Sequence, residues 1–151
     1  MTFDVNTTLT GLQEMQAANL RRIALLQPDG ALGRLVRDVT VELHRYAVGI
    51  THVGQYRKTS KGTYTYSRNG GIGGGALRAS HRVEASGLRG RVFIDEGAVN
   101  PLTRARPAEY GLYENRRGGE HAFYTRTVAE IWPQASAQYG AEFLVDFAEA
   151  S

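Results

Sequence analysis

The stretch from residue 70 to residue 95 restricts the possible folds of this chain more than any other part. It begins with a cluster of five glycines, at positions 70, 71, 73, 74 and 75, and continues into Ala76-Leu77-Arg78-Ala79-Ser80. Two alternating segments follow, residues 81–85 and 89–95, and Ser86-Gly87 between them predicts the turn of a β-hairpin. A glycine-rich loop, the segment of residues 76–80 and a hairpin, in that order, leave no room for a catalytic centre. We therefore expect one edge of a subunit that packs against copies of itself.

The length and composition predict one domain with a single core. The chain has 151 residues, of which 42% are hydrophobic and 22% are charged. Cysteine is absent, which excludes a disulfide framework and a thiolate metal site. The first residues lack a basic start and an apolar run, and no stretch approaches the roughly 20 apolar residues of a membrane-spanning helix. We expect a soluble protein of a reducing cytoplasm, with no membrane partner.

Two helices are predicted in the first region, residues 1–54. Apolar residues recur at helical spacing over residues 9–26 and again over residues 32–50. Pro28 and Gly30 lie between these two stretches and mark a turn, and Gly54 ends the second. A short turn of this kind favours an antiparallel helix pair.

A basic arm is predicted at residues 55–75. The alternation of hydroxyl and aromatic side chains over residues 63–67 is typical of a strand, and Ser60-Lys61-Gly62 is typical of a hairpin tip. The clearer hairpin follows in residues 76–95.

The last region, residues 107–151, contains a short apolar piece and a long closing helix. Apolar residues keep helical spacing from Phe123 to the end, and Pro133 predicts a kink or a restart near Trp132. Helices laid on a small antiparallel sheet with a protruding hairpin arm make an α+β domain.

The charge is unevenly distributed along the chain. Residues 1–53 are balanced, residues 54–106 carry ten Lys or Arg against three acids, and residues 107–151 carry three Arg against seven acids. Such a division suits nucleic acid, or a contact between the middle of one subunit and the end of its neighbour. Alternatively, these charges only keep the surface solvated.

Three short motifs carry a resemblance to a known family. They are Gly74-Gly75-Ala76-Leu77-Arg78-Ala79-Ser80 before the hairpin, Tyr110-Gly111-Leu112-Tyr113-Glu114 after it, and the apolar lead-in of residues 123–129 to the closing helix. In this order they resemble the neck or tail-completion proteins of long-tailed bacteriophages, which are small minor tail proteins that join the head to the tail.

The resemblance implies a structural protein of the virion, made in the host bacterial cytoplasm, without enzymatic activity, cofactor or metal. It implies a homo-oligomeric ring, a hexamer or a dodecamer, in the role of a neck, completion or tail terminator protein. The implied partners are the head-side connector or stopper and the tail tube or terminator proteins.

The subunit interface is expected at the motif and around it. A guanidinium at the entrance to a strand can bind a carboxylate or the carbonyls of a neighbouring chain, whereas the alternative is an ion pair within its own domain. The expected interface residues are Leu77, Arg78, Arg82, Arg89, Glu109, Tyr110 and Glu114.

A nucleic-acid-binding module is the alternative function. The arm interleaves aromatic and cationic side chains, as single-strand binders do, and it could contact either DNA in a channel lumen or a neighbouring ring. The arm residues concerned are Tyr56, Arg57, Lys58, Lys61, Tyr64, Tyr66 and Arg68.

Catalytic patterns are weak in this sequence. Residues 71–76 approximate a dinucleotide-binding fingerprint, but a polar arm and not an apolar strand precedes them. The four histidines show no metal-ligand spacing, and no serine lies in a nucleophile elbow. Asp95 and Glu96 are adjacent and would point to opposite faces of a strand. An enzyme is not expected.

Overall fold

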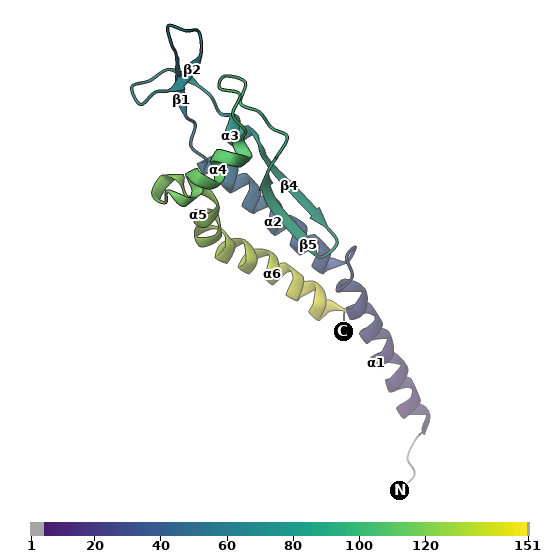
Figure 1. Cartoon of the computed structure of the whole chain (residues 1–151). Helices are drawn as coiled ribbons and strands as arrows, with labels where there is room; N and C mark the ends of the chain where they lie inside the picture. The colour runs from purple at the N-terminus through teal and green to yellow at the C-terminus, as the bar shows by residue number, and fades with distance from the viewer. Residues whose placement is uncertain (1–4, 151) are drawn as a thin grey trace.

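The computed structural model describes residues 5–150 of the chain, and the side chains of residues 11–150 (Figure 1). It is an α+β structure, as expected, with helices and two small antiparallel sheets. The helices are α1 (Val5–Leu25), α2 (Ala31–Ile50), α3 (Ala76–Ala79), α4 (Pro107–Arg116), the 3₁₀ turn η1 (Gly119–His121), α5 (Phe123–Glu130) and α6 (Trp132–Glu149). The strands are β1 (Gln55–Lys58), β2 (Tyr64–Tyr66), β3 (Ile72–Gly73), β4 (His81–Ser86) and β5 (Arg89–Ile94).

Helix α2 lies at the centre of the body of the molecule, by which we mean α2, the hairpin of β4 and β5, and helices α3 to α6. The hairpin of β4 and β5 lies on one side of it, and α5 and α6 lie on another. The sequence predicts a helix here. Its buried positions are Ala31, Gly33, Val39, Thr40 and Ala47, and most of its large apolar side chains are half-buried. The helix ends at Ile50, four residues before Gly54, because Thr51 leaves the helical conformation.

The predicted hairpin is confirmed, with the turn one residue later than expected. His81 pairs with Ile94 and Val83 with Val92, so these four side chains share the face that lies toward α2. Gly87, at φ 59°, and Leu88 form the turn. A Cβ on Gly87 would lie 3.5 Å from Pro28, which places the hairpin tip beside the turn between α1 and α2.

The arm is a three-stranded sheet in the order β2-β1-β3, and its third strand is not predicted by the sequence. Tyr56 on β1 pairs with Tyr66 on one side and with Ile72 on the other. Two glycines make room for Tyr56, since a Cβ on Gly71 would lie 2.3 Å from its carbonyl oxygen and a Cβ on Gly74 2.4 Å from its ring. The glycine cluster therefore folds against its own arm.

The small core lies where the hairpin meets α3, α4 and α5. Leu77, Ile94 and Phe123 pack together there. Gly111 lets α4 approach this cluster, because a Cβ at that position would lie 2.5 Å from Ile94 and 2.8 Å from Leu77.

The closing helix is divided as Pro133 predicts. Ile131 separates α5 from α6, and Pro133 falls in the first turn of α6, where its missing N–H costs no intrahelical hydrogen bond.

The expected antiparallel packing of the first two helices is wrong. Helix α1 does not fold back along α2 but projects from the end of the body (Figure 1). Gly30 in the intervening turn allows a tight passage, because a Cβ at that position would lie 2.3 Å from the carbonyl oxygen of Ala24.

Candidate interaction surfaces

Leu77 and Arg78, which the sequence predicts at a subunit interface, both make contacts within the subunit. Leu77 is buried in the core. The guanidinium of Arg78 donates from Nε and Nη2 to the carbonyl of Thr51, at 3.0 and 2.8 Å, and from Nη2 to that of Gly49 at 3.4 Å. It thus binds carbonyls at the C-terminal end of α2, where a cation is favoured. The alternative of a contact within the domain holds for Arg78, with backbone carbonyls in place of a carboxylate.

The other expected interface residues are distributed over β4, the start of β5 and α4. Arg82 lies 3.2 Å from Asp95 in an ion pair. Arg89 is exposed beside the hairpin turn, while Glu109 is exposed in the first turn of α4. Tyr110 is half-buried against the core, and burial raises its pKa above the usual range. Glu114 contacts Arg117, which follows α4, and His121 on η1.

The arm presents only part of its predicted set to solvent. Tyr56 and Tyr64 are half-buried, and the guanidinium of Arg57 donates to the carbonyls of Gly70 and Asn69 at 2.9 and 2.7 Å. The exposed members are Arg57, Lys58, Lys61, Tyr66 and Arg68. These leave a cationic surface with one exposed aromatic ring at the end of the molecule farthest from α1 (Figure 1).

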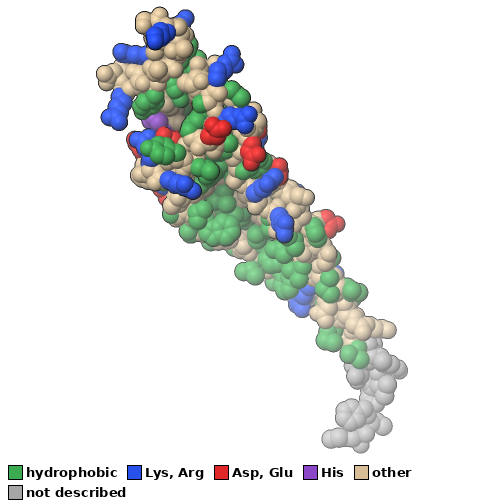
Figure 2. All heavy atoms as spheres, viewed as in Figure 1, with side chains coloured by type: hydrophobic (Ala, Val, Ile, Leu, Met, Phe, Trp, Pro, Cys, Tyr) green, Lys and Arg blue, Asp and Glu red, His purple; other side chains and the backbone are tan. Residues whose placement is uncertain are grey.

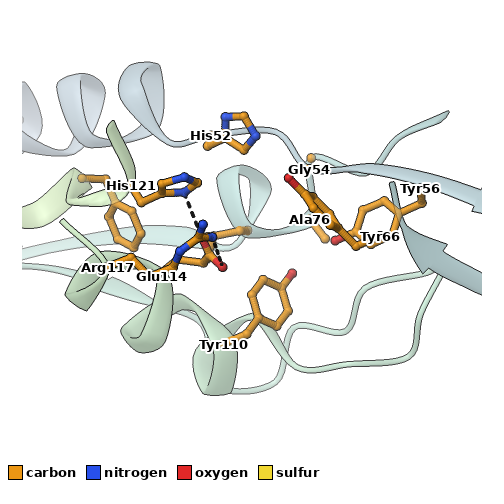
Figure 3. Close-up of a pocket in the computed structure, with 12 residues that line it drawn as sticks. His52, Gly54, Tyr56, Tyr66, Ala76, Tyr110, Glu114, Arg117 and His121 are labelled. Carbon is orange, nitrogen blue, oxygen red and sulfur yellow. Dashed lines mark hydrogen bonds and ion pairs between the residues drawn. The ribbon is translucent and has the colours of Figure 1, made fainter. Parts of the chain in front are cut away.

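A cavity of about 150 Å³ lies between the base of the arm and α4 (Figure 3). Tyr56 and Tyr66 line it from the arm, and the Glu114 carboxylate faces it from α4. That carboxylate is already engaged, because Arg117 lies 2.9 Å and His121 lies 2.8 Å from it. Glu114, Arg117 and His121 therefore form an internal polar cluster in the wall of the cavity.

A buried polar chain joins α2, β4 and α5. His81 Nε2 lies 2.8 Å from the Thr51 hydroxyl, and Nδ1 lies 3.1 Å from the Tyr124 hydroxyl. Burial lowers the pKa of His81 to about 4, with His44 adding to the shift, and burial raises the pKa of Tyr124 to about 12. All three side chains are neutral near pH 7, which suits a structural connection in the interior.

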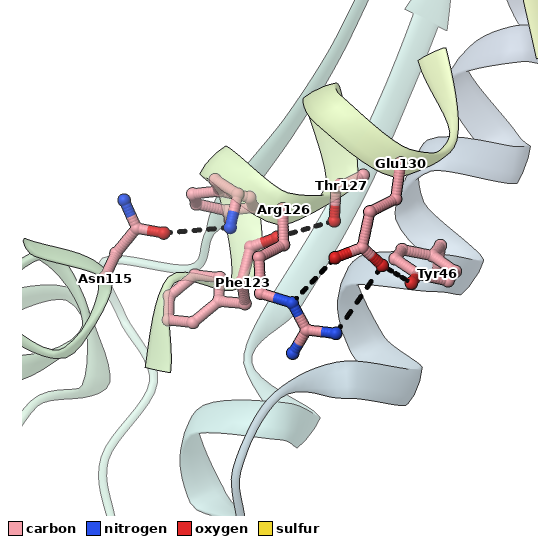
Figure 4. Close-up of polar contacts among 7 residues, drawn as sticks. Tyr46, Asn115, Phe123, Arg126, Thr127 and Glu130 are labelled. Carbon is pink, nitrogen blue, oxygen red and sulfur yellow. Dashed lines mark hydrogen bonds and ion pairs between the residues drawn. The ribbon is translucent and has the colours of Figure 1, made fainter. Parts of the chain in front are cut away.

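Helix α5 is fixed at both ends by polar contacts (Figure 4). Asn115 on α4 accepts a hydrogen bond of 2.8 Å from the backbone N–H of Tyr124, in the first turn of α5. At the other end, Glu130 accepts from Arg126 at 2.9 Å and from the Tyr46 hydroxyl on α2. These bonds lower the pKa of Glu130 and raise that of Tyr46. These contacts fix the position of α5 beside α2, where α5 forms a wall of the groove described next.

An apolar groove of about 610 Å³ opens between this wall and the hairpin. Its floor is α2, and its walls are β5 with the hairpin turn on one side and α5 with the start of α6 on the other. Figure 2 shows hydrophobic side chains gathered over the middle of the body, where α6 passes beside the hairpin. The large side chains exposed in this groove are Leu88, Val128 and Trp132.

Most polar side chains that line the groove are already bonded within the chain. The hydroxyls of Thr40 and Thr127 donate to carbonyls of their own helices, at 2.5 and 2.6 Å. The Tyr124 hydroxyl meets His81, and Arg91 pairs with Glu84 at 2.8 Å. Few polar groups remain for a polar ligand, so the groove suits an apolar surface.

Helix α1 presents a second apolar surface. Five large apolar side chains are between 41% and 67% exposed here: Leu12, Met15, Leu20 and Ile23 on the helix and Leu26 just after it. Their spacing of three to five residues places them along one face of the helix. This stripe was expected to face the second helix, and the structure leaves it open.

Within residues 5–150, no three His, Cys, Asp or Glu side chains gather in a group that could hold a metal ion. No helix in that range is both long and apolar enough to cross a bilayer. The arrangement defines an α+β protein whose distinctive features are two open apolar surfaces and a cationic arm. Comparison of the chain with protein families, curated proteins and solved structures gives no match.

Proposed function

We propose that this protein is a self-assembling structural subunit of the head–tail junction of a long-tailed bacteriophage. In this role, copies form a ring, a hexamer or a dodecamer, between the head-side connector or stopper and the tail tube or terminator proteins. The subunit acts through surfaces and not through catalysis, and its place is the virion, after synthesis in the host bacterium.

The observation that carries this proposal is the extent of open apolar surface on so small a body. A monomer rarely exposes a contiguous apolar patch larger than a few hundred Å² unless the patch is an interaction site. Here a groove and a projecting helix are both apolar and both open. The resemblance of residues 74–80, 110–114 and 123–129 to neck and tail-completion proteins supplies the phage context.

The test is to locate the protein in particles. Antibodies against the purified protein, applied to phage particles that encode it, should label the junction between head and tail in electron micrographs. Particles from a deletion strain should accumulate as separate heads and tails. Normal, infectious particles without the protein would contradict the proposed function.

Nucleic-acid binding remains the second candidate because of the arm. Lys58, Lys61 and Arg68 are exposed: Lys58 lies on β1 of the sheet that carries the exposed ring of Tyr66, and the other two lie in the turns before and after β2. Cations that follow a phosphate backbone beside a ring that stacks on bases form the usual single-strand binding surface.

Salt dependence separates the two candidates. If the arm binds DNA, the logarithm of the binding constant should fall linearly with the logarithm of salt concentration, and replacing Lys58, Lys61 and Arg68 together by Glu should abolish binding. Fluorescence anisotropy with a labelled oligonucleotide measures both. A ring that binds no DNA at physiological salt would eliminate this candidate.

A further inference from the structure

The projecting helix α1 and the groove are both apolar, and they do not meet within one subunit. The apolar stripe of α1 faces solvent, while the groove lies on the body, between the hairpin and α5. We propose that α1 of one copy docks into the groove of the next copy, so that subunits join head to tail. This contact would build the ring of the proposed function, but it rests on the two surfaces and not on the phage role.

The direction of α1 is held by contacts at its base. Arg21 donates from Nε to the carbonyl of Ala150 at 3.3 Å, and the Arg22 guanidinium lies 5.6 Å from the centre of the Phe147 ring on α6. The turn after α1 is closely packed as well, since a Cβ on Gly33 would lie 1.7 Å from the carbonyl oxygen of Pro28. These contacts keep the stripe away from its own groove.

The groove has the chemistry that a helix face requires. Apolar helices commonly bind in grooves through side chains at spacings of three and four residues. The Thr40, Thr127 and Ser136 hydroxyls of this groove each donate to a carbonyl of their own helix, so little desolvation of free polar groups accompanies docking.

The available area is sufficient for a specific contact. With side chains about half exposed, the α1 stripe and the groove rim together offer roughly 800 Å² of apolar surface, and flanking atoms bring the total to the order of 1,200 Å² needed by a stable interface. Helix α1 has 21 residues and so spans about 31 Å. A helix-to-groove contact is heterologous, and it generates a ring if the rotation closes and a filament if it does not.

Two charge variants test this arrangement. Met15→Glu places a carboxylate in the stripe of α1, and Val128→Glu places one on the groove wall. Both side chains are more than half exposed in the monomer, at 54% and 60%, so the fold should survive. Ala17→Glu and Ala129→Glu are the matched controls, because these exposed positions lie on other faces of α1 and α5.

Native mass spectrometry should show the wild type and both controls as oligomers, and each charge variant alone as a monomer. A mixture of the two charge variants retains one intact helix and one intact groove between them, so it should form a dimer of twice 16.6 kDa and nothing larger. Circular dichroism melts of the separate variants should match the wild type.

A second measurement uses the natural absence of cysteine from the chain. Met15→Cys and Val128→Cys are mild changes, and a short bismaleimide should link a mixture of the two into a dimer far more than it links either alone.

Three results would overturn the proposal: a wild type that stays monomeric, charge variants that assemble normally, or loss of assembly in Met15→Glu alone, which indicates pairing of α1 with α1. A head-to-tail oligomer that is absent from phage particles would leave this contact established and reject the phage role.

Discussion

At the scale of single residues, Arg78 shows how a motif residue can serve the fold. The sequence suggests a contact with a neighbouring chain. In the structure, the guanidinium donates hydrogen bonds to two carbonyls at the end of α2. These carbonyls lie 27 and 29 residues away in the chain. Local sequence patterns do not show which residues so far apart in the chain come into contact, so this interaction could not be predicted.

Replacing Arg78 should therefore destabilise the subunit itself. Arg78→Ala is expected to lower the free energy of unfolding by about 1–3 kcal/mol, because it removes charge-assisted hydrogen bonds at a helix C-terminus. Arg45→Ala is the control, since Arg45 on α2 forms a largely exposed ion pair at 3.5 Å with Glu42 and should cost less than about 1 kcal/mol. Urea denaturation measures both. Equal effects, or weakened association at unchanged stability, would contradict the structural role.

His81 predicts a pH dependence of stability. Its pKa falls from 6.5 in the unfolded chain to about 4 in the folded one, so the unfolded state binds more protons between these values. The free energy of unfolding should therefore rise with pH from about 4 to about 6.5, by up to roughly 3 kcal/mol from this residue. His81→Gln should be less stable at pH 7 and should lack this part of the dependence.

Thermal melts at several pH values, compared between the wild type and His81→Gln, isolate the contribution of His81 from that of the other titrating groups. Parallel curves for the two proteins over this pH range would show that His81 is not buried in its neutral form.

At the scale of elements, local signals predict the helices and the hairpin well. Periodic apolar residues give α2, alternation with Ser86-Gly87 gives β4 and β5, and Pro133 gives the break before α6. The two-residue strand β3 is not predicted, because glycines carry no side-chain pattern. The packing of α1 is predicted wrongly, since a stripe shows which face is apolar but not which surface covers it.

The fit of the hairpin on α2 gives a test at this scale. A Cβ on Gly90 would lie 1.8 Å from the Thr40 hydroxyl, so Gly90→Ala should force β5 away from α2 and cost about 1–3 kcal/mol. Gly140→Ala is the matched control, because α6 leaves open space at that position and alanine favours a helix by up to about 1 kcal/mol. Chemical denaturation should show opposite signs. A neutral Gly90→Ala would contradict the close packing of the hairpin.

At the scale of the whole molecule, the structure is elongated, with the cationic arm at one end and α1 at the other (Figure 1). Trp132 illustrates what this means for the predicted sites. It keeps the helical spacing of a core residue, yet it is 50% exposed and lines the open groove. The sequence identifies the apolar side chains. Which of them are buried in the core and which line an open surface depends on the spacing of α2, β5 and α5 around the groove. That division is a property of the tertiary structure.

The central claim is that these apolar surfaces are interfaces between copies of the chain. Mass photometry or native mass spectrometry of the wild-type protein, from nanomolar to high micromolar concentration, tests it most directly. We predict a closed oligomer of defined size that forms as concentration rises and that electron microscopy shows as a ring. A protein that remains a monomer of 16.6 kDa over the whole range would contradict the claim.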